Sequence, residues 1–325
     1  MEYEDLEKRL RQEQRRLAFQ HSKKRRRILW SLLALLLVVL GLVWAFWRGP
    51  WQGLFGKPSP QLGYREEALA GETARIQLID VGQGLGLLVE SGGEALLIDG
   101  GGGNASSKTV AVLQSRGIQR LKYVVITHYD EDHMGGAIGA LRAIGAQQVL
   151  GPDYEEDSRS FRSLTAWLQE AGQEMIHPRP GEVFTLGHCQ FTVLGPLGRQ
   201  AIENDNSLVL RLSDGRNALL LTGDCEAAGE AALVAAWGRE LKSDIYVVGH
   251  HGSYTSSTAA FLAKVKPRYL LLSCGVNNEY GHPHQAALGR LQQTGAAMWR
   301  TDRQGDIRLI WTKEDIFWET EPAGW

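Results

Sequence analysis

Residues 123–136 read YVVITHYDEDHMGG, an apolar strand-like run followed at once by histidines and acidic residues. Four potential metal ligands, His128, Asp130, Asp132 and His133, fall within six residues. Imidazole and carboxylate together are donors that suit zinc and manganese. Alternate ligand positions directly after a buried strand are not the pattern of scattered surface aspartates or of a single structural histidine. The stretch therefore predicts a metal centre at the end of a strand, with glycines that let a helix begin beside it.

Strand and helix signals alternate through the region around this stretch. Antiparallel hairpins come early in each half, and strand–helix units follow them, which predicts an α/β (α+β) body of two packed sheets with helices outside. We expect strands at 74–80, 85–90, 95–99, 123–127, 184–186, 190–194, 207–212, 218–222, 245–248, 269–273, 298–301 and 307–311, and helices at 108–116, 135–144, 226–237, 258–264 and 285–293.

The N-terminal part differs in composition from this body. Residues 1–27 hold ten Lys/Arg against five Asp/Glu, whereas residues 28–325 hold 25 against 32, a net charge of −7. Gly, Pro and Gln are frequent in residues 48–73, as in flexible linkers. We therefore divide the chain into a basic arm at 1–27, an apolar segment at 28–47, a linker at 48–73 and a folded domain at 74–325.

The apolar segment 28–47, ILWSLLALLLVVLGLVWAFW, has twenty residues and no charge. A helix of about 20 such residues spans the hydrocarbon layer of a membrane, and tryptophans near its ends suit the interface. Five basic residues at 23–27 precede it and only Arg48 follows closely, so the positive-inside rule places the N-terminus in the cytoplasm. We expect a single-pass cell-membrane protein whose folded domain is extracytoplasmic. A cleaved signal peptide and a buried core helix are the alternatives.

The overall composition excludes several protein classes. With 43% hydrophobic and 22% charged residues, the chain is neither disordered nor collagen-like nor a polytopic membrane protein. Cys189, Cys225 and Cys274 form no CxxC pair, which excludes a disulfide scaffold and a cysteine zinc finger. Cys189 and Cys274 are expected to be buried, and the Cys225 side chain to point away from that of Asp224.

Short polar motifs recur where apolar strands end. Together with HYDEDH they resemble the metallo-β-lactamase superfamily, in the variant with aspartate as second ligand, and within it the hydrolase domain of ComEC-type DNA-uptake proteins. This resemblance covers residues 74–313 and implies a four-layer αββα sandwich, with two metals in a groove at the sheet edges and a nuclease role. ComEC-type proteins carry a polytopic channel, so transport does not follow for a chain with one span. The motifs are DVGQG at 80–84, LIDGG at 97–101, NDNSLV at 204–209, LTGD at 221–224, GHHGS at 249–253 and YGHPH at 280–284.

The resemblance also implies ligand roles. His128 and Asp130 would hold a first metal, Asp132 and His133 a second, and Asp224 would bridge the two. A hydroxide shared by the two ions would be the nucleophile. The ions are expected to be zinc or manganese, with magnesium as an alternative, because the carboxylate of Asp130 hardens the site.

Two further histidines follow apolar strands, and their roles stay open. His250 or His282 would complete a coordination shell or contact the leaving group, and we count His250 with Asp132 and Asp224 as catalytic. The third ligand of the first metal also stays open. The remaining candidates would orient ligands, contact substrate or form turns: Asp80, Asp99, Asn206, Ser207, His251, Ser253 and His284.

The substrate is less clearly indicated than the chemistry. The ComEC-type motifs, with hydroxyl groups at Ser253 and 256–258, favour a phosphodiester, with single-stranded DNA as one candidate. The net charge of −7 opposes nucleic-acid binding, and the basic arm would lie across the membrane from the site. Hydrolysis of small or cell-envelope esters, phosphodiesters or lactones is the second hypothesis, and a metal-free binding module the third. The sequence identifies no protein partner.

Overall fold

The structure is a computed structural model that describes residues 71–322. The predicted arm, the predicted membrane segment and nearly all of the predicted linker lie outside the described residues. Within residues 71–322, no helix combines the length and apolar character needed to cross a membrane.

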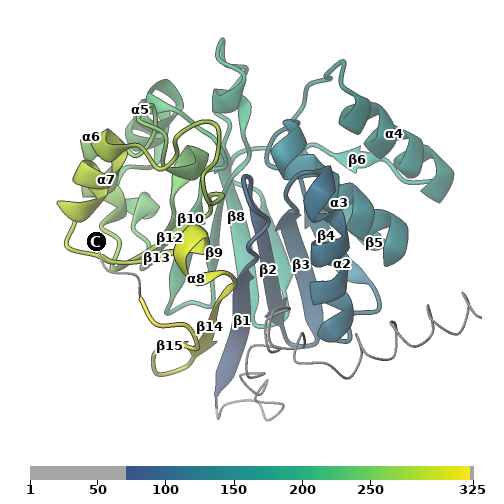
Figure 1. The fold of residues 1–325 in the computed structure, drawn as a ribbon, viewed down its shortest axis with the longest axis horizontal. Helices are drawn as coiled ribbons and strands as arrows, with labels where there is room; N and C mark the ends of the chain where they lie inside the picture. Colours follow the sequence, from purple (N-terminus) through teal and green to yellow (C-terminus); the bar gives the residue numbers. More distant parts are fainter. Residues whose placement is uncertain (1–70, 323–325) are drawn as a thin grey trace, which may run out of the picture. The chain divides into compact units, whose positions relative to one another are not determined.

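Fifteen strands in this part of the chain form two sheets (Figure 1). The first sheet contains β1 (Glu72–Leu78), β2 (Gly86–Ser91), β3 (Glu94–Asp99), β4 (Leu121–Val125), β5 (Ala146–Leu150), β6 (Met175–Ile176), β14 (Ile307–Thr312) and β15 (Ile316–Trp318). The second contains β7 (Val183–Leu186), β8 (Cys189–Gly195), β9 (Val209–Ser213), β10 (Ala218–Leu221), β11 (Ile245–Val247), β12 (Tyr269–Leu272) and β13 (Ala297–Arg300). Their orders are β15-β14-β1-β2-β3-β4-β5-β6 and β13-β12-β11-β10-β9-β8-β7.

Helices cover the outer face of each sheet. Within the described residues these are α2 (Ser106–Ser115), α3 (Glu131–Ala143), α4 (Arg159–Ala171), α5 (Ala227–Trp237), α6 (Ala259–Val265) and α7 (Gln285–Gln292), with a short α8 (Thr301–Gln304) before β14. Buried side chains of α2, α3 and α4 pack on the first sheet, and those of α5, α6 and α7 pack on the second. Helix, sheet, sheet and helix thus follow one another, and the expected two-sheet α/β architecture is confirmed.

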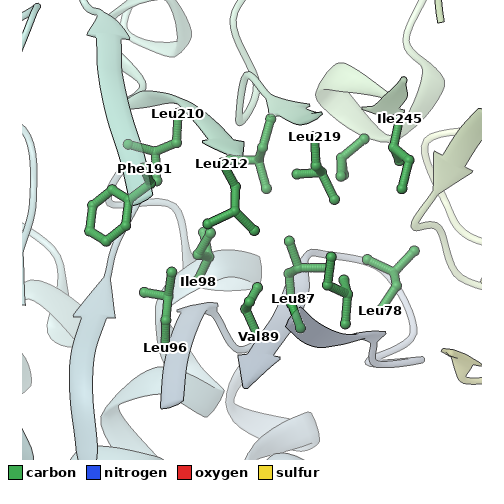
Figure 2. Packing of buried hydrophobic residues seen from close by; sticks show 14 of the residues in the cluster. Leu78, Leu87, Val89, Leu96, Ile98, Phe191, Leu210, Leu212, Leu219 and Ile245 are labelled. Atoms are coloured by element: carbon green, nitrogen blue, oxygen red, sulfur yellow. The ribbon is translucent and has the colours of Figure 1, made fainter. Parts of the chain in front are cut away.

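The core between the sheets follows from the alternation of side chains along each strand. Leu87 and Val89 of β2 face the other sheet, whereas Leu88 between them faces the helices. Figure 2 shows Leu87 and Val89 opposite Leu212 and Leu219 of the second sheet. Each such leucine that is removed from water contributes about 1.5–3 kcal/mol to folding. Strands buried on both faces therefore read as continuous apolar runs, such as ALLL of β10.

Most of the strands and helices lie within a few residues of the predicted ranges. β1 begins at Glu72, two residues before the predicted start. Residues 145–183 received no predicted element, but they contain β5, α4 and β6. Two adjacent glutamines interrupt the apolar pattern of β5, and both are exposed. The helix α4 begins after Ser158, whose side chain accepts a hydrogen bond from the Phe161 amide as an N-cap.

Glycines bring the start of α3 against the loop that follows β3. The Gly100 amide donates to the His133 carbonyl at 2.9 Å, and the Gly136 amide donates to the Gly101 carbonyl at 2.8 Å. A Cβ atom on Gly136 would lie only 1.8 Å from the Gly100 carbonyl oxygen. This close approach fixes the backbone of His133 relative to the first sheet.

We expect Gly136→Ala to lower the free energy of unfolding by about 3 kcal/mol or more, because the backbone on both sides must move apart. Gly289 in α7 is the matched control, since a Cβ atom there meets no atom within 4 Å. Gly289→Ala should raise stability by about 0.5–1 kcal/mol through helix propensity. Denaturant unfolding of both variants measures the contrast. Equal effects would mean that the approach of α3 to this loop is not tight.

Candidate metal centre

Side chains from both sheets meet where β4, β10 and β11 end. The strand β4 leads into His128, and Asp130 stands directly before α3. The strand β10 leads into Asp224, which is buried. The strand β11 leads into a short 3-10 turn, Gly249–Gly252, that carries two histidines. The centre therefore forms only when the two sheets are packed together.

Asp132, His133 and His251 form one compact group, with one ligand atom of each lying within 4.8 Å of the others. His251 Nε2 lies 3.4 Å from Asp132 Oδ2 and 3.4 Å from Asp224 Oδ2. His133 Nε2 lies 3.4 Å from Asp224 Oδ1 and 3.1 Å from His251 Nε2. We call Asp132, His133, His251 and Asp224 the inner set.

We call His128, Asp130 and Asp224 the outer set; ligand atoms of His128 and Asp224 also lie within 4.8 Å of one on His133. His128 Nε2 lies 3.6 Å from Asp130 Oδ2 and 3.9 Å from Asp224 Oδ2. His250 Nε2 approaches the same Asp224 oxygen at 3.6 Å. The His128 side chain is fully buried, yet its Nε2 has no hydrogen-bond partner among the described residues. A buried nitrogen that lies beside two carboxylates and makes no hydrogen bond has the surroundings of a metal ligand.

Hydrogen bonds made by the Nδ1 atoms fix the orientation of the two imidazoles in the inner set. His133 Nδ1 lies 2.8 Å from Asp99 Oδ2, and His251 Nδ1 lies 3.1 Å from the Ser273 carbonyl. Both partners only accept, so Nδ1 carries the proton and donates it, which leaves Nε2 as the atom for a cation. Asp99 also accepts hydrogen bonds from the Thr127 amide and hydroxyl.

Backbone strain lies at these same positions. Asp99 has φ +56°, and His250 and His251 have φ +49° and +52°. Residues other than glycine rarely adopt this left-handed region, and two consecutive histidines in it cost free energy that the surrounding packing must offset. The turn is tied down by the His250 amide, which donates to the Gly223 carbonyl at 3.1 Å. This strained conformation brings the imidazoles of both His250 and His251 close to the Asp224 carboxylate.

Opposite charges dominate the inner set. Burial disfavours protonation of His133, but the Asp224 and Asp99 carboxylates outweigh it and raise the pKa well above its ordinary value. Burial also opposes the charge of His251, yet Asp224 and Asp132 raise its pKa to about 9. Burial would raise the pKa of Asp224, but the facing imidazoles of His251 and His133 hold it well below its usual range. Cations that bind here therefore compete with protons, and their affinity should fall as the pH falls.

Comparison with known proteins decides the family. Residues 79–276, which include every member of both sets, match the metallo-beta-lactamase superfamily. The chain belongs to this superfamily. A crystal structure of the metallo-beta-lactamase fold protein YhfI from Bacillus subtilis shares the fold, with a TM-score of 0.51 at 17% identity over 72% of this chain and 99% of that one.

Two curated relatives narrow the resemblance within the superfamily. The competence protein ComA of Neisseria gonorrhoeae is 34% identical over 76% of this chain, and the recombination protein 2 of Haemophilus influenzae is 30% identical over 74%. The expected resemblance to ComEC-type competence proteins is confirmed. The chain spans about a third of the length of these relatives, namely 34% and 29%.

His282 lies beside the candidate metal centre and belongs to neither the inner set nor the outer set. Its ring centroid is 5.5 Å from that of His250 and 6.1 Å from that of His251. Gln83 Oε1 accepts a hydrogen bond from the Gly275 amide at 3.3 Å, so the Gln83 amino group faces His282 Nδ1, at 3.4 Å. His282 Nδ1 then accepts, and the proton of a neutral ring is on Nε2. Burial and the neighbouring His251 and His250 lower the pKa of His282 to about 4.

The other predicted residues lie around the centre in supporting positions. Asp80 accepts a hydrogen bond from the Gly82 amide and pairs with Lys108, as a turn-forming carboxylate does. Ser207 accepts a hydrogen bond from the Asp224 amide at 3.3 Å. Asn206 bonds only to backbone of residues 200–203 in the described structure, so it fixes that loop.

The serine and histidine of the last two motifs support the turn after β11. Ser253 Oγ lies 2.9 Å from Thr255 Oγ1, which in turn lies 3.3 Å from His250 Nδ1. His284 Nδ1 accepts a hydrogen bond from the Tyr254 amide at 3.1 Å. The Cys225 sulfur contacts Asp205 and belongs to the apolar cluster between the second sheet and its helices, and all three cysteines are buried and free.

Sequence reasoning missed several residues that touch the centre. Glu226 Oε1 lies 3.5 Å from His250 Nδ1. Glu156 and Glu203 lie close to Asp130. Burial and the carboxylates of Glu203 and Asp130 raise the pKa of Glu156. Thr127, the last residue before the HYDEDH motif, contacts both Asp99 and His128. Glu226 lies two residues after Asp224, and this spacing was the available signal for it.

Proposed function

We propose that this chain is a metal-dependent phosphodiesterase that acts on nucleic acid. The observation that carries the proposal is the position of Asp224 between the two sets. Its Oδ1 faces His133, and its Oδ2 faces His128, His250 and His251, all at 3.4–3.9 Å. One buried carboxylate that is shared by two groups of ligands is the arrangement that holds two divalent cations side by side.

The donor set fits divalent ions of intermediate hardness. The outer set offers one imidazole and two carboxylates, and the inner set offers two of each, with Asp224 counted in both. Mixed nitrogen and oxygen donors favour manganese or zinc, and magnesium is the harder alternative. The orphaned Nε2 of His128 supports a cation at the outer set.

When bound, the two ions would lower the pKa of water and stabilise negative charge on the phosphate. The chain's own residues do the rest. Asp132 and Asp224 would hold the ions in place, and Asp99 and Ser273 keep the two inner imidazoles aimed at them. Burial lowers the pKa of His250, so this imidazole is neutral near pH 7. His282 is neutral as well, and its Nε2–H is a hydrogen-bond donor for a phosphate oxygen or a leaving group.

One observation favours a nucleic-acid phosphodiester over a lactone or lactam, and a charge balance weakens the main objection to it. The relatives of 30–34% identity are named for competence and recombination, both of which concern DNA. Two divalent cations would also more than balance the three carboxylates of Asp130, Asp132 and Asp224. The net charge of −7 over residues 28–325 then opposes binding of a polyanion less strongly than the sequence alone implies.

The proposal includes an anchor in the cell membrane. Residues 28–47 carry no charge and follow five consecutive basic residues, which supports a single span with the hydrolase domain outside. Protease added to intact spheroplasts should then digest the hydrolase domain. Protection of that domain would reverse the topology.

The test of the function uses the full chain, purified in detergent and loaded with Mn²⁺ or Zn²⁺. We expect about two ions per chain by mass spectrometry, with hydrolysis of bis-p-nitrophenyl phosphate and of single-stranded DNA. Absence of bound metal would favour a binding module. Two bound ions with hydrolysis of lactones or carboxylic esters, but not of either phosphodiester, would favour the small-ester hypothesis.

A further inference from the structure

A pocket of about 410 Å³ adjoins the metal centre. It lies between the start of α5, the loop before α6 and Arg290 of α7. Its volume falls within the range of small-molecule sites, about 300–1,000 Å³. None of the residues proposed above as metal ligands lines it, so the pocket is a separate feature of the surface.

Two lining residues connect the pocket to the centre. Glu226 Oε1 lies 3.5 Å from His250 Nδ1, and Thr255 Oγ1 lies 3.3 Å from the same nitrogen. His250 in turn faces Asp224 at 3.6 Å. A phosphodiester held at the centre carries one substituent on each side of its phosphorus. One of these substituents would therefore reach the pocket.

The lining combines small apolar residues, one aromatic ring and several polar side chains. Ile202, Ala228 and Ala259 supply small apolar surface, and Tyr254 supplies a ring that is 62% exposed. Glu226, Thr255, Thr258 and Arg290 supply the polar part of the lining. A phosphate would meet the Glu226 carboxylate, which disfavours an anionic occupant. A planar, neutral group with a polar edge suits the Tyr254 ring and the polar residues beside it.

The wall that carries Tyr254 is held rigidly. The Tyr254 amide donates to His284 Nδ1, and Arg290 donates to the carbonyls of Tyr254, Ser256 and Ser257 at 2.6–2.9 Å. The carboxylate of Glu230 is fully buried and accepts hydrogen bonds from the amides that follow, at 257 and 258. A rigid wall loses little entropy when a ligand binds.

We propose that this pocket binds the nucleoside on one side of the scissile phosphodiester, with Tyr254 stacked on its base. The inference rests on the proposed function and names the part of the substrate that the site selects. Base–aromatic stacking tolerates every sequence because each base has a π-face.

The experiment compares two chromogenic esters that share one leaving group, thymidine 5′-(p-nitrophenyl phosphate) and methyl p-nitrophenyl phosphate. The Mn²⁺-loaded full chain should prefer the thymidine ester in kcat/KM by at least about tenfold, since this is the scale of one stacked base. Ala228→Phe fills the pocket from an exposed helix position and should reduce that preference about tenfold. Tyr254→Ala should reduce it similarly, and Tyr254→Phe should restore it.

Ala235→Phe is the matched control, because Ala235 is exposed on the same helix and does not line the pocket. The Ala235→Phe variant should prefer the thymidine ester in kcat/KM as strongly as the parent chain does. Loss of preference in Ala235→Phe as well, or full preference in Ala228→Phe, would overturn the pocket assignment.

A binding measurement separates this inference from the proposed function. Fluorescent oligothymidylate should bind more tightly than an abasic strand of equal length, and Ala228→Phe should abolish the difference. If neither ester is cleaved but this difference holds, the hydrolytic proposal fails and the pocket stands. If both esters are cleaved equally and the two strands bind equally, the pocket proposal fails and the phosphodiesterase stands.

Discussion

Asp224→Asn should lower phosphodiester hydrolysis by on the order of 10³-fold or more, because it disturbs the carboxylate that both ligand sets share. An amide keeps the size of the carboxylate but presents one oxygen instead of two anionic ones. The variant should retain fewer than two ions per chain at micromolar metal. Metal should also raise its Tm less than it raises that of the parent, since stabilisation by a ligand follows affinity.

The metal-free variant should show a dependence on pH with a definite sign. In the parent, Asp224 helps to raise the pKa of His133 and to bring that of His251 to about 9. The stability from these raised pKa values is fully present below about pH 6.5, and it is lost as the pH rises through about 9. Without the carboxylate, the buried histidines lose their counter-charge, which costs roughly 3–5 kcal/mol near pH 6. The deficit should narrow toward pH 9.

Thermal unfolding of parent and variant between pH 6 and 9, with EDTA or with Mn²⁺, measures both effects beside the phosphodiesterase assay. Parental activity in Asp224→Asn would remove this residue from the centre. A deficit in stability that did not change with pH would show that Asp224 acts as a strand-end carboxylate and not as the counter-charge of the two histidines.

The second large effect should separate His251 from His282. His251→Ala removes an imidazole whose Nε2 lies 3.4 Å from both Asp132 and Asp224, so we expect loss of one ion and a fall in activity of more than about 100-fold. His282→Ala should keep two ions and reduce activity about tenfold, the value of one hydrogen bond to a charged group.

Metal stoichiometry by mass spectrometry is the decisive readout for this pair, because activity falls in both variants. His188, exposed on the turn between β7 and β8, supplies the control. His188→Ala should match the parent in metal content and rate. Loss of an ion from His282→Ala, with two ions kept in His251→Ala, would exchange the roles assigned to the two residues.

The HYDEDH segment could be interpreted from sequence because its ligands are close neighbours on one loop. Local spacing places His128, Asp130, Asp132 and His133 together whatever the rest of the fold does. The strand that leads to Asp224 was equally clear, since ALLL is followed at once by a polar turn. These elements depend on short-range patterns alone.

The choice among the later histidines could not be predicted in the same way. Nothing in the GHHGS motif shows that both histidines adopt positive φ, and this conformation brings His251 as well as His250 to Asp224. The carbonyl that accepts the hydrogen bond from His251 belongs to Ser273, directly after the neighbouring strand β12. Tertiary contacts of this kind do not appear in a one-dimensional pattern, and the same holds for Glu156 and Glu203 beside Asp130.

The division of the inner set between two sheets has a consequence for protein synthesis. His133 and His251 are 118 residues apart in the chain. A ribosome that adds 5–20 residues per second needs roughly 6–24 s to make that stretch. During this interval the nascent chain exposes Asp132 and His133 without their partners, and it can hold an ion only weakly. On the proposed function, ion capture would therefore be a late step of biogenesis, after translation has delivered the second sheet.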